Sequence, residues 1–343
     1  MTAIMKNILV AFDEYMNTAP LPSRTREGAA EKTIKGYVHD VNDFLQWWKQ
    51  SEGDALMIDS LRKDPFSLNK KIIQDYVNYL ERSVAITTLL RKVSSLRAFV
   101  KFLQVSKIVE HEPMNGLRLP RKAEPEPRGL NGNQRARFEV VFQNPWIDKT
   151  TKRKRSKEIE ENVLKDASNH LIRDKAIAFL IMYAGPRVDE LFHLNISHIE
   201  LKEKSGSLHI RKGKGFKERR TSIPLPARKA LHAWLELYRY LDASYSKNSP
   251  LFIRLRGKPG GRLSIRAIQD MVSEAGKRAR IDEPVTPHIL RHTCAFMLRQ
   301  AGADIETRAK MLGHSIETAS KYGAPGESEI EKAASLLDYA EAA

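Results

Sequence analysis

The proline-rich stretch at residues 113–129 is the feature that most constrains how this chain can fold. It reads PMNGLRLPRKAEPEPRG, with four prolines, two glycines and charges of both signs. Proline fixes one backbone angle and removes a hydrogen-bond donor, so neither a helix nor a central strand continues through such a segment. The sequence therefore predicts two domains, at 1–117 and 130–343, joined by a linker at 118–129. With 343 residues, the chain is long enough to bury a core in each domain.

The segment before the linker has the periodicity of helices. Its apolar residues recur at spacings of three and four, as on the buried face of an amphipathic helix. Trp47 and Trp48 fit such a stripe and are expected in the core. We therefore expect an all-helical N-terminal domain. After a short apolar segment at 8–12, the expected helices are 33–48, capped by Thr33, then one from the cap Ser67 to residue 80, and 86–103.

The helix expected at 86–103 also has a polar face. A basic helix face of this kind can lie in the major groove of DNA. An ordinary solvated face has the same composition, and this segment alone does not decide between the two. The candidate DNA-contacting residues on this face are Thr87, Arg91, Lys92 and Ser95.

After the linker the helical pattern continues with one interruption. Over residues 207–225, apolar and polar residues alternate on both sides of a turn rich in glycine and lysine, which is typical of a β-hairpin. The predicted fold class is therefore mostly α, with a small antiparallel β-hairpin and a helical N-terminal domain. The expected helices are 176–183, 187–194, 226–240, 264–275, 287–301, 304–312 and 327–340.

The start of the helix at 287–301 suggests a binding site. Thr286 is a good N-cap, and Pro287 suits the first helical position, where its missing N–H costs nothing. His288 and Arg291 are three residues apart and share one face. An arginine and a histidine near a helix N-terminus can bind an anion, most naturally a phosphate. Taken alone, the segment also fits a solvated polar face.

The charge of the chain indicates a polyanionic partner. The formal net charge is +16 and the pI is near 9.7, which makes nucleic acid the first candidate. The basic run at 149–157, KTTKRKRSK, is expected to be an exposed loop that touches the phosphate backbone. Its composition also fits a nuclear-localisation signal, which we rank lower because nothing else in the sequence suggests a nuclear protein.

Composition also excludes several classes of protein. The single cysteine, Cys294, excludes a disulfide framework and a cysteine-rich zinc site. No apolar run approaches the ~20 residues of a membrane span. The N-terminal residues lack the pattern of a signal peptide. We expect an intracellular protein that does not enter a membrane.

Six residues have no good structural explanation in the helical pattern. Guanidinium groups can grip the non-bridging oxygens of a phosphate and neutralise developing charge, so this set suits phosphoryl transfer with a tyrosine nucleophile. No carboxylate arrangement resembles a magnesium or two-metal site, and we expect neither a metal nor a cofactor. The six residues are Arg187, Lys214, His288, Arg291, His314 and Tyr322.

In its motifs the sequence resembles the tyrosine site-specific recombinases of the lambda-integrase class, which include Cre and the Xer proteins. Each motif alone is weak, but all four occur, in the family's order. They are AGPRVDEL at 184–191, GKGFKER at 213–219, HILRH at 288–292, and LGHS at 312–315 followed by Tyr322. The resemblance covers residues 30 to 325 and extends to a helical core-binding, SAM-like domain before the linker.

This resemblance implies a role for each motif residue. Tyr322 matches the nucleophile, which leaves a 3′-phosphotyrosine and a free 5′-hydroxyl. Arg187 and Arg291 match the arginines that bind the scissile phosphate. Glu190 matches an acidic residue that supports the site from behind the residues that contact the phosphate. Lys214 matches the general acid that protonates the leaving 5′-oxygen; Lys212 and Lys217 are close enough in sequence to be alternatives, and both are also candidate DNA contacts. His288 matches the histidine that handles the tyrosine proton, and His314 matches a residue that donates a hydrogen bond to the phosphate. His292 matches no catalytic position and is expected to be structural.

The resemblance also implies an assembly. Four copies would act on two double-stranded DNA sites with inverted repeats, exchanging strands through a Holliday junction without a cofactor. The helix at 327–340 would dock on a neighbouring protomer, although it could equally pack on its own chain. The expected location is the cytoplasm of a prokaryote, at the nucleoid. Integration, excision, transposition, resolution and inversion all use this chemistry, and the sequence does not decide between them.

Two other classes of protein would explain part of this sequence pattern. A type IB topoisomerase-like enzyme uses the same chemistry but acts alone by nicking and swivelling. The recombinase-like N-terminal module and the expected docking helix argue against it. A DNA-binding regulator without chemistry would explain the charge, but it leaves the order of the four motifs unexplained.

Overall fold

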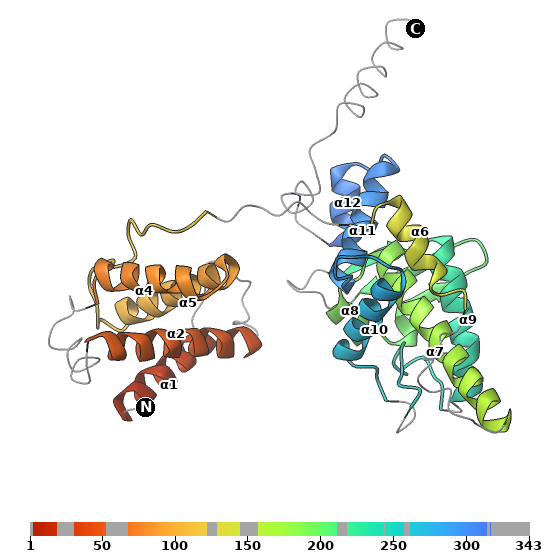
Figure 1. Ribbon diagram of the computed structural model, residues 1–343, viewed down its shortest axis with the longest axis horizontal. Helices are drawn as coiled ribbons and strands as arrows, with labels where there is room; N and C mark the ends of the chain where they lie inside the picture. The colour runs from red at the N-terminus through yellow and green to blue at the C-terminus, as the bar shows by residue number, and fades with distance from the viewer. Residues whose placement is uncertain are drawn as a thin grey trace, which may run out of the picture. The chain divides into compact units, whose positions relative to one another are not determined.

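The computed structural model describes residues 3–18, 31–52, 68–121, 129–144, 157–210, 218–242, 244–256, 261–313 and 316. The chain forms two compact units, Met1–Glu124 and Pro125–Ala343, each with its own hydrophobic core (Figure 1).

The described part of the N-terminal unit is helical. It consists of α1 (Ala3–Thr18), α2 (Glu31–Glu52), α4 (Lys70–Ser83) and α5 (Ile86–Val105). Helix α2 packs against α1, α4 and α5 (Figure 1). Large aromatic side chains fill the space between these helices, and Trp48 is buried among them. Trp47 is only half-buried and packs on Tyr76.

The expected helical N-terminal domain is therefore confirmed, with two differences at the helix starts. Helix α2 begins at Glu31, two residues before the expected cap Thr33. Helix α4 begins after Asn69, whose side chain accepts a hydrogen bond from the Ile72 N–H at 3.2 Å. Asn69 is as good a cap as the expected Ser67, and it lies next to the first helical residue.

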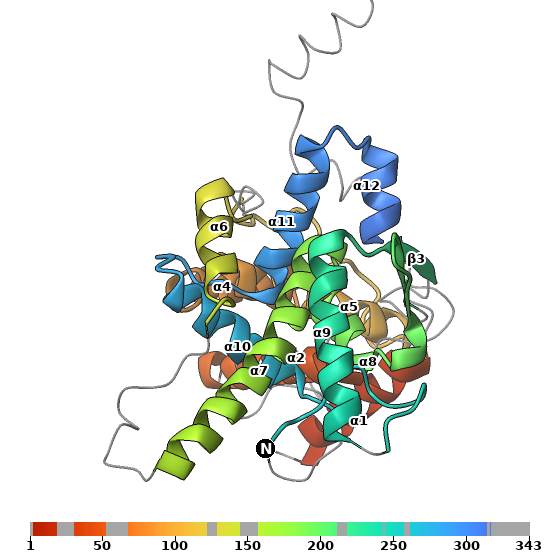
Figure 2. The same ribbon diagram turned by 90° about the vertical axis from the view of Figure 1, so that its right-hand side faces the viewer.

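Helix α7 (Lys157–Ala184) is the centre of the second unit. It packs against α9 (Leu225–Leu241) and α11 (Pro287–Gln300), and Figure 2 shows α7 and α9 side by side. The sequence predicted only its last part, 176–183, because that part is apolar on every side and lies fully in the core. The other helices are α6 (Gly132–Val140), α8 (Val188–His193), α10 (Ile265–Arg278), α12 (Ile305–Leu312) and the 3-10 turn η3 (Ile196–His198).

A small antiparallel sheet lies beside these helices. Its order is β1 (Ile199–Leu201), β2 (Gly206–Ile210) and β3 (Arg219–Ser222). Strands β2 and β3 form the predicted hairpin, in which Leu208 lies opposite Thr221. The sequence did not predict β1, because three residues are too few to show alternation. Helix α12 lies against β3 (Figure 2).

The predicted start of α11 is confirmed, and α12 is capped at both ends. Thr286 accepts a hydrogen bond from the Ile289 N–H at 3.3 Å, and Pro287 is the first residue of α11. Asp304 caps α12 by accepting from the Thr307 N–H at 2.7 Å. Gly313 ends α12 with a φ of +65°, a left-handed conformation that glycine adopts without strain.

The fold class is confirmed: the chain is mostly helical with a small antiparallel sheet. None of the helices in the described ranges is long and apolar enough to cross a membrane.

Candidate active site

A buried carboxylate, Glu190, is the centre of the site. Its side chain is 1% exposed. Oε1 accepts hydrogen bonds from Nη1 of Arg187 and Nη1 of Arg219, both at 2.9 Å. Oε2 accepts from the backbone N–H of Arg187 at 2.8 Å and from Nη2 of Arg219 at 2.6 Å. Nη1 of Arg291 lies 3.9 Å from Oε2. One carboxylate thus holds together three arginines from three separate elements.

The arginines decide the charge of Glu190. Burial alone would raise the pKa of this carboxyl. The hydrogen bonds and charge of Arg219, together with the hydrogen bonds from Arg187, outweigh burial and lower the pKa to about 2. Glu190 is therefore ionised throughout the physiological range, and the three arginines leave a local charge of +2.

Arg187 is placed by the turn before α8. Gly185 has a φ of +67°, and a Cβ there would collide with Leu312 and approach the sulfur of Cys294. This turn lets Pro186 lead directly into Arg187, which is the N-cap of α8 and not a residue within the helix. Nη2 of Arg187 donates to the carbonyl of Gly313 at 3.0 Å. The side chain remains 30% exposed, so it can reach a ligand.

Arg291 is the most buried arginine of the cluster, with 2% of its side chain exposed. Its Nη1 donates to the carbonyl of Gly185, and its Nη2 donates to the carbonyl of Leu312. It therefore joins the turn before α8 to the end of α12. A guanidinium held in this way has a fixed orientation and a permanent charge.

His288 lies one turn before Arg291 on α11 and is exposed. Partial burial and the charges of Arg291 and Arg187 lower its pKa below the ordinary value. The neutral imidazole, which can accept a proton, is therefore its main form near pH 7. The ring of His292 packs edge-on against it at 4.3 Å between centroids. Burial, His288 and Arg291 lower the pKa of His292 to about 4.

Arg219 also belongs to this cluster; from the sequence alone it had no assigned role, although it lies in the predicted hairpin and ends the motif GKGFKER at 213–219. Its side chain is 8% exposed. The available signal was the alternation of strand β3, in which Arg219 and Thr221 face inward and Arg220 faces outward. An inward-facing arginine on a strand requires a buried acidic partner, but the sequence does not say which one.

The other expected site residues lie outside the described part of the chain. The described structure ends beside the cluster at two points, Gly313 and Glu218, and the motif segments continue from there. The undescribed residues and segments include Lys212, Lys214, Lys217, His314, Tyr322, the basic run up to residue 156, and the expected helix at 327–340.

The structure corrects two of the DNA contacts expected on α5. Lys92 and Ser95 are buried and face α2, where they meet two carboxylates. Nζ of Lys92 lies 3.5 Å from Asp40 and 2.5 Å from Asp43, and the Ser95 hydroxyl donates to Asp40 at 2.8 Å. A buried cation needs such partners. Lys92 and Ser95 therefore hold α5 on α2 and are not available to a ligand.

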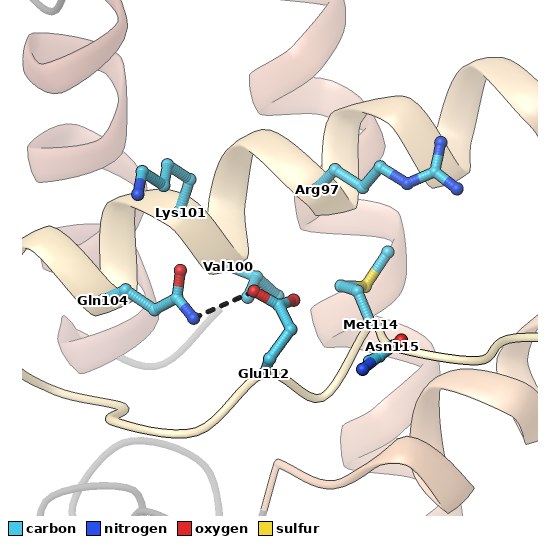
Figure 3. Close-up of a pocket in the computed structure, with 7 residues that line it drawn as sticks. All are labelled: Arg97, Val100, Lys101, Gln104, Glu112, Met114 and Asn115. Atoms are coloured by element: carbon cyan, nitrogen blue, oxygen red, sulfur yellow. Dashed lines mark hydrogen bonds between the residues drawn. The ribbon is translucent and has the colours of Figure 1, made fainter.

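The exposed face of α5 carries other cations. Thr87 is exposed, and Arg91 is half-exposed while its guanidinium contacts Asp40. Arg97 and Lys101, which were not among the DNA contacts predicted from the sequence, are exposed and pair with no carboxylate in the described ranges. They flank an open groove of about 340 Å³ that also contains the hydrogen-bonded pair Gln104 and Glu112, with Val100, Met114 and Asn115 (Figure 3).

Comparison with known proteins places both units in one family. The model of the phage integrase family matches residues 152–328, and the model of the N-terminal SAM-like domain of phage integrases matches residues 8–108. A tyrosine recombinase XerC from Anoxybacillus flavithermus is 28% identical over 286 residues, covering 83% of this chain and 84% of that protein. A XerC from Syntrophus aciditrophicus is 27% identical over 327 residues, covering 93% of each.

Solved structures show the same fold. The XerH site-specific recombinase bound to a palindromic difH substrate, in a post-cleavage complex, aligns with a TM-score of 0.61 at 17% identity, covering 97% of each chain. The chain therefore belongs to the phage integrase family. It is a tyrosine-type site-specific recombinase, similar along its length to the Xer recombinases.

Proposed function

We propose that this enzyme cleaves and rejoins double-stranded DNA at specific sites through a 3′-phosphotyrosine intermediate. The observation that supports this most is the cluster around Glu190, where three arginines and one carboxylate leave a charge of +2 next to the motif segments. A phosphodiester in transesterification gains negative charge on its non-bridging oxygens, and fixed guanidinium groups stabilise that charge.

In the proposed reaction, Tyr322 attacks the scissile phosphorus and forms the new P–O bond. His288, neutral near pH 7, accepts the tyrosine proton. Arg187 and Arg291 bind the non-bridging oxygens, and His314 adds a hydrogen bond. The bond to the 5′-oxygen breaks, and Lys214 gives that oxygen its proton. Attack by a 5′-hydroxyl reverses these steps and rejoins the DNA, so no external energy source is needed.

The N-terminal unit is the proposed DNA-binding module, with the linker at 118–129 connecting it to the catalytic domain at 130–343. On α5 the residues offered to DNA are Thr87, Arg91, Arg97 and Lys101, because they are exposed on one face of the helix. Lysine and arginine at such positions contact phosphate oxygens and set the position of the protein on the duplex. The basic run at 149–157 would add further phosphate contacts.

The proposed assembly is a tetramer on two sites with inverted repeats, which exchanges strands in two steps through a Holliday junction. The support is the similarity to Xer recombinases and to XerH, which is bound to a palindromic substrate. A symmetric site requires a symmetric arrangement of protomers. The helix at 327–340 would make the contact between protomers. We place the enzyme at the nucleoid of a prokaryotic cytoplasm.

The decisive experiment is covalent trapping on DNA. The substrate is a duplex that the wild-type protein itself selects from a randomised library, rebuilt with a nick so that the cleaved end diffuses away. Wild type should form an adduct that survives boiling in detergent, and Tyr322→Phe should form none. An adduct that persists in Tyr322→Phe would remove this residue as the nucleophile.

The same substrate tests the proton donor. Replacing the 5′-bridging oxygen by sulfur gives a leaving group that needs no proton, so this substrate should restore cleavage by Lys214→Ala. If it restores Lys212→Ala or Lys217→Ala instead, the general acid is that residue. Arg187→Ala and Arg291→Ala should bind the DNA but cleave neither substrate.

A further inference from the structure

Arg219, the inward-facing arginine of strand β3, forms hydrogen bonds that fix the orientation of a carboxylate in the site. Its guanidinium donates to both oxygens of Glu190, at 2.9 and 2.6 Å. A bidentate pair of this kind fixes the plane of the carboxylate as well as its position. Arg187 uses the same two oxygens, one through its side chain and one through its backbone N–H. The orientation of Arg187 is therefore coupled to the orientation that Arg219 imposes on Glu190.

Arg219 is also pressed against the end of α12. A Cβ on Gly313 would lie 2.7 Å from Nη1 of Arg219, so the glycine lets the guanidinium approach the backbone there. The carbonyl of Gly313 accepts from Arg187, and the carbonyl of Leu312 accepts from Arg291. The end of α12 is thus held by hydrogen bonds from Arg187 and Arg291, and Arg219 packs beside it.

Arg219 lies close in sequence or in space to two segments that carry proposed catalytic residues. The segment before strand β3 contains Lys214, and the residue after Gly313 is His314. Arg219 therefore lies on the strand that follows the proposed general acid, and its guanidinium packs beside the helix end that precedes the proposed phosphate ligand. In the described part of the chain, the charged groups that face Glu190 are Arg187 from the start of α8, Arg219 from β3 and Arg291 from α11.

We propose that Arg219 is a positioning residue of the recombinase, an inference that rests on the proposed function. It orients the carboxylate of Glu190, through which Arg187 is aimed at the scissile phosphate. It does not touch the DNA itself. A lysine cannot replace it fully, because an ammonium group cannot hold both oxygens of one carboxylate in a fixed plane.

The matched variants are Arg219→Gln and Arg220→Gln. Arg220 is the next residue on the same strand, faces solvent and pairs with Glu200, which is also exposed. Both variants remove one positive charge from β3, but only the first affects Glu190. In single-turnover cleavage of the nicked duplex selected by wild type, Arg219→Gln should be about 10- to 100-fold slower, while Arg220→Gln stays close to wild type. DNA affinity should stay close to that of wild type in both, because neither residue is a proposed DNA contact.

Two further readouts separate positioning from mere stability. If Arg219 acts through Glu190, then adding Arg219→Gln to Glu190→Gln should slow cleavage no further, which a double-mutant cycle measures. In Arg219→Gln the buried carboxylate loses its main partner and its pKa rises, so the cleavage rate relative to wild type should fall as the pH is lowered from 7.5. Wild type serves as the reference at each pH, which cancels the titration of His288.

The outcomes separate the two proposals. If wild type forms no adduct, the proposed function fails before Arg219 is tested. If wild type forms the Tyr322 adduct and Arg219→Gln cleaves like Arg220→Gln, the role of Arg219 alone is overturned; additive effects in the double-mutant cycle also overturn it. Should Arg219→Gln fail to fold, Arg219→Lys decides, because the charge is kept. Slow cleavage supports the bidentate role, and a wild-type rate overturns it.

Discussion

Replacing Glu190 by glutamine removes the counter-charge of the cluster and keeps its shape. The lowering of the Glu190 pKa from 4.5 to about 2 corresponds to about 3 kcal/mol in favour of the charged carboxylate, at about 1.4 kcal/mol per unit. Removing one partner of a buried ion pair costs about 3–5 kcal/mol. The glutamine carbonyl still accepts one hydrogen bond, so we expect Glu190→Gln to lower the free energy of unfolding by about 3 kcal/mol near pH 7.

The pH dependence of this loss follows from the sign of the shift. A carboxyl with a depressed folded-state pKa contributes its full stability above the unfolded value near 4.5, and this stability is lost as the pH falls toward 2. The difference between wild type and Glu190→Gln should therefore be constant from about pH 8 to pH 5. It should begin to shrink only below that range.

Urea-dependent hydrogen exchange of peptides from α7 measures this loss in the C-terminal unit separately from the other unit. The matched control is Glu200→Gln, which removes an exposed carboxylate paired with Arg220 and should change little. A loss below about 1 kcal/mol for Glu190→Gln, or one that is already halved at pH 5.5, would refute the account of a charged, buried centre.

Three further predictions concern other positions. Gly185→Ala should destabilise the C-terminal unit by about 1–2 kcal/mol, because its φ is +67° and the new Cβ meets Leu312. Gly132→Ala, in the same unit and with open space for a Cβ, is the control, and both are read by the same exchange experiment. Asp40→Asn should destabilise the N-terminal unit by about 2 kcal/mol, because Lys92 and Ser95 lose a buried partner, as measured by exchange of α2 peptides. The double variant Arg97→Gln, Lys101→Gln should weaken DNA binding and make the slope of log affinity against log salt shallower by about two.

Each of these has a contradicting result. A Gly185→Ala protein as stable as wild type would mean that the turn can relax without cost. Equal stability of wild type and Asp40→Asn would mean that Asp43 alone suffices for Lys92. For the pair on α5, an unchanged salt slope, with Arg82→Gln at the exposed end of α4 as the control, would exclude phosphate contacts at these positions.

The sequence by itself determined the local structure around the site. Thr286 and Pro287 act within three or four residues of their own positions, and both sit where the pattern predicted. The four motifs, the hairpin and the helical N-terminal domain follow from spacing along the chain. Such signals depend only on residues close in sequence, so they can be recognised without knowledge of the fold.

Tertiary structure decided which charged side chains meet. On α5, Lys92 and Arg97 both carry a positive charge, but packing on α2 buries the first beside Asp40 and leaves the second exposed. Arg219 and Glu190 are 29 residues apart, and only the folding of β3 against the start of α8 brings them together. The energy of a buried ion pair depends on removal from water and on geometry, and neither is written in the spacing of residues.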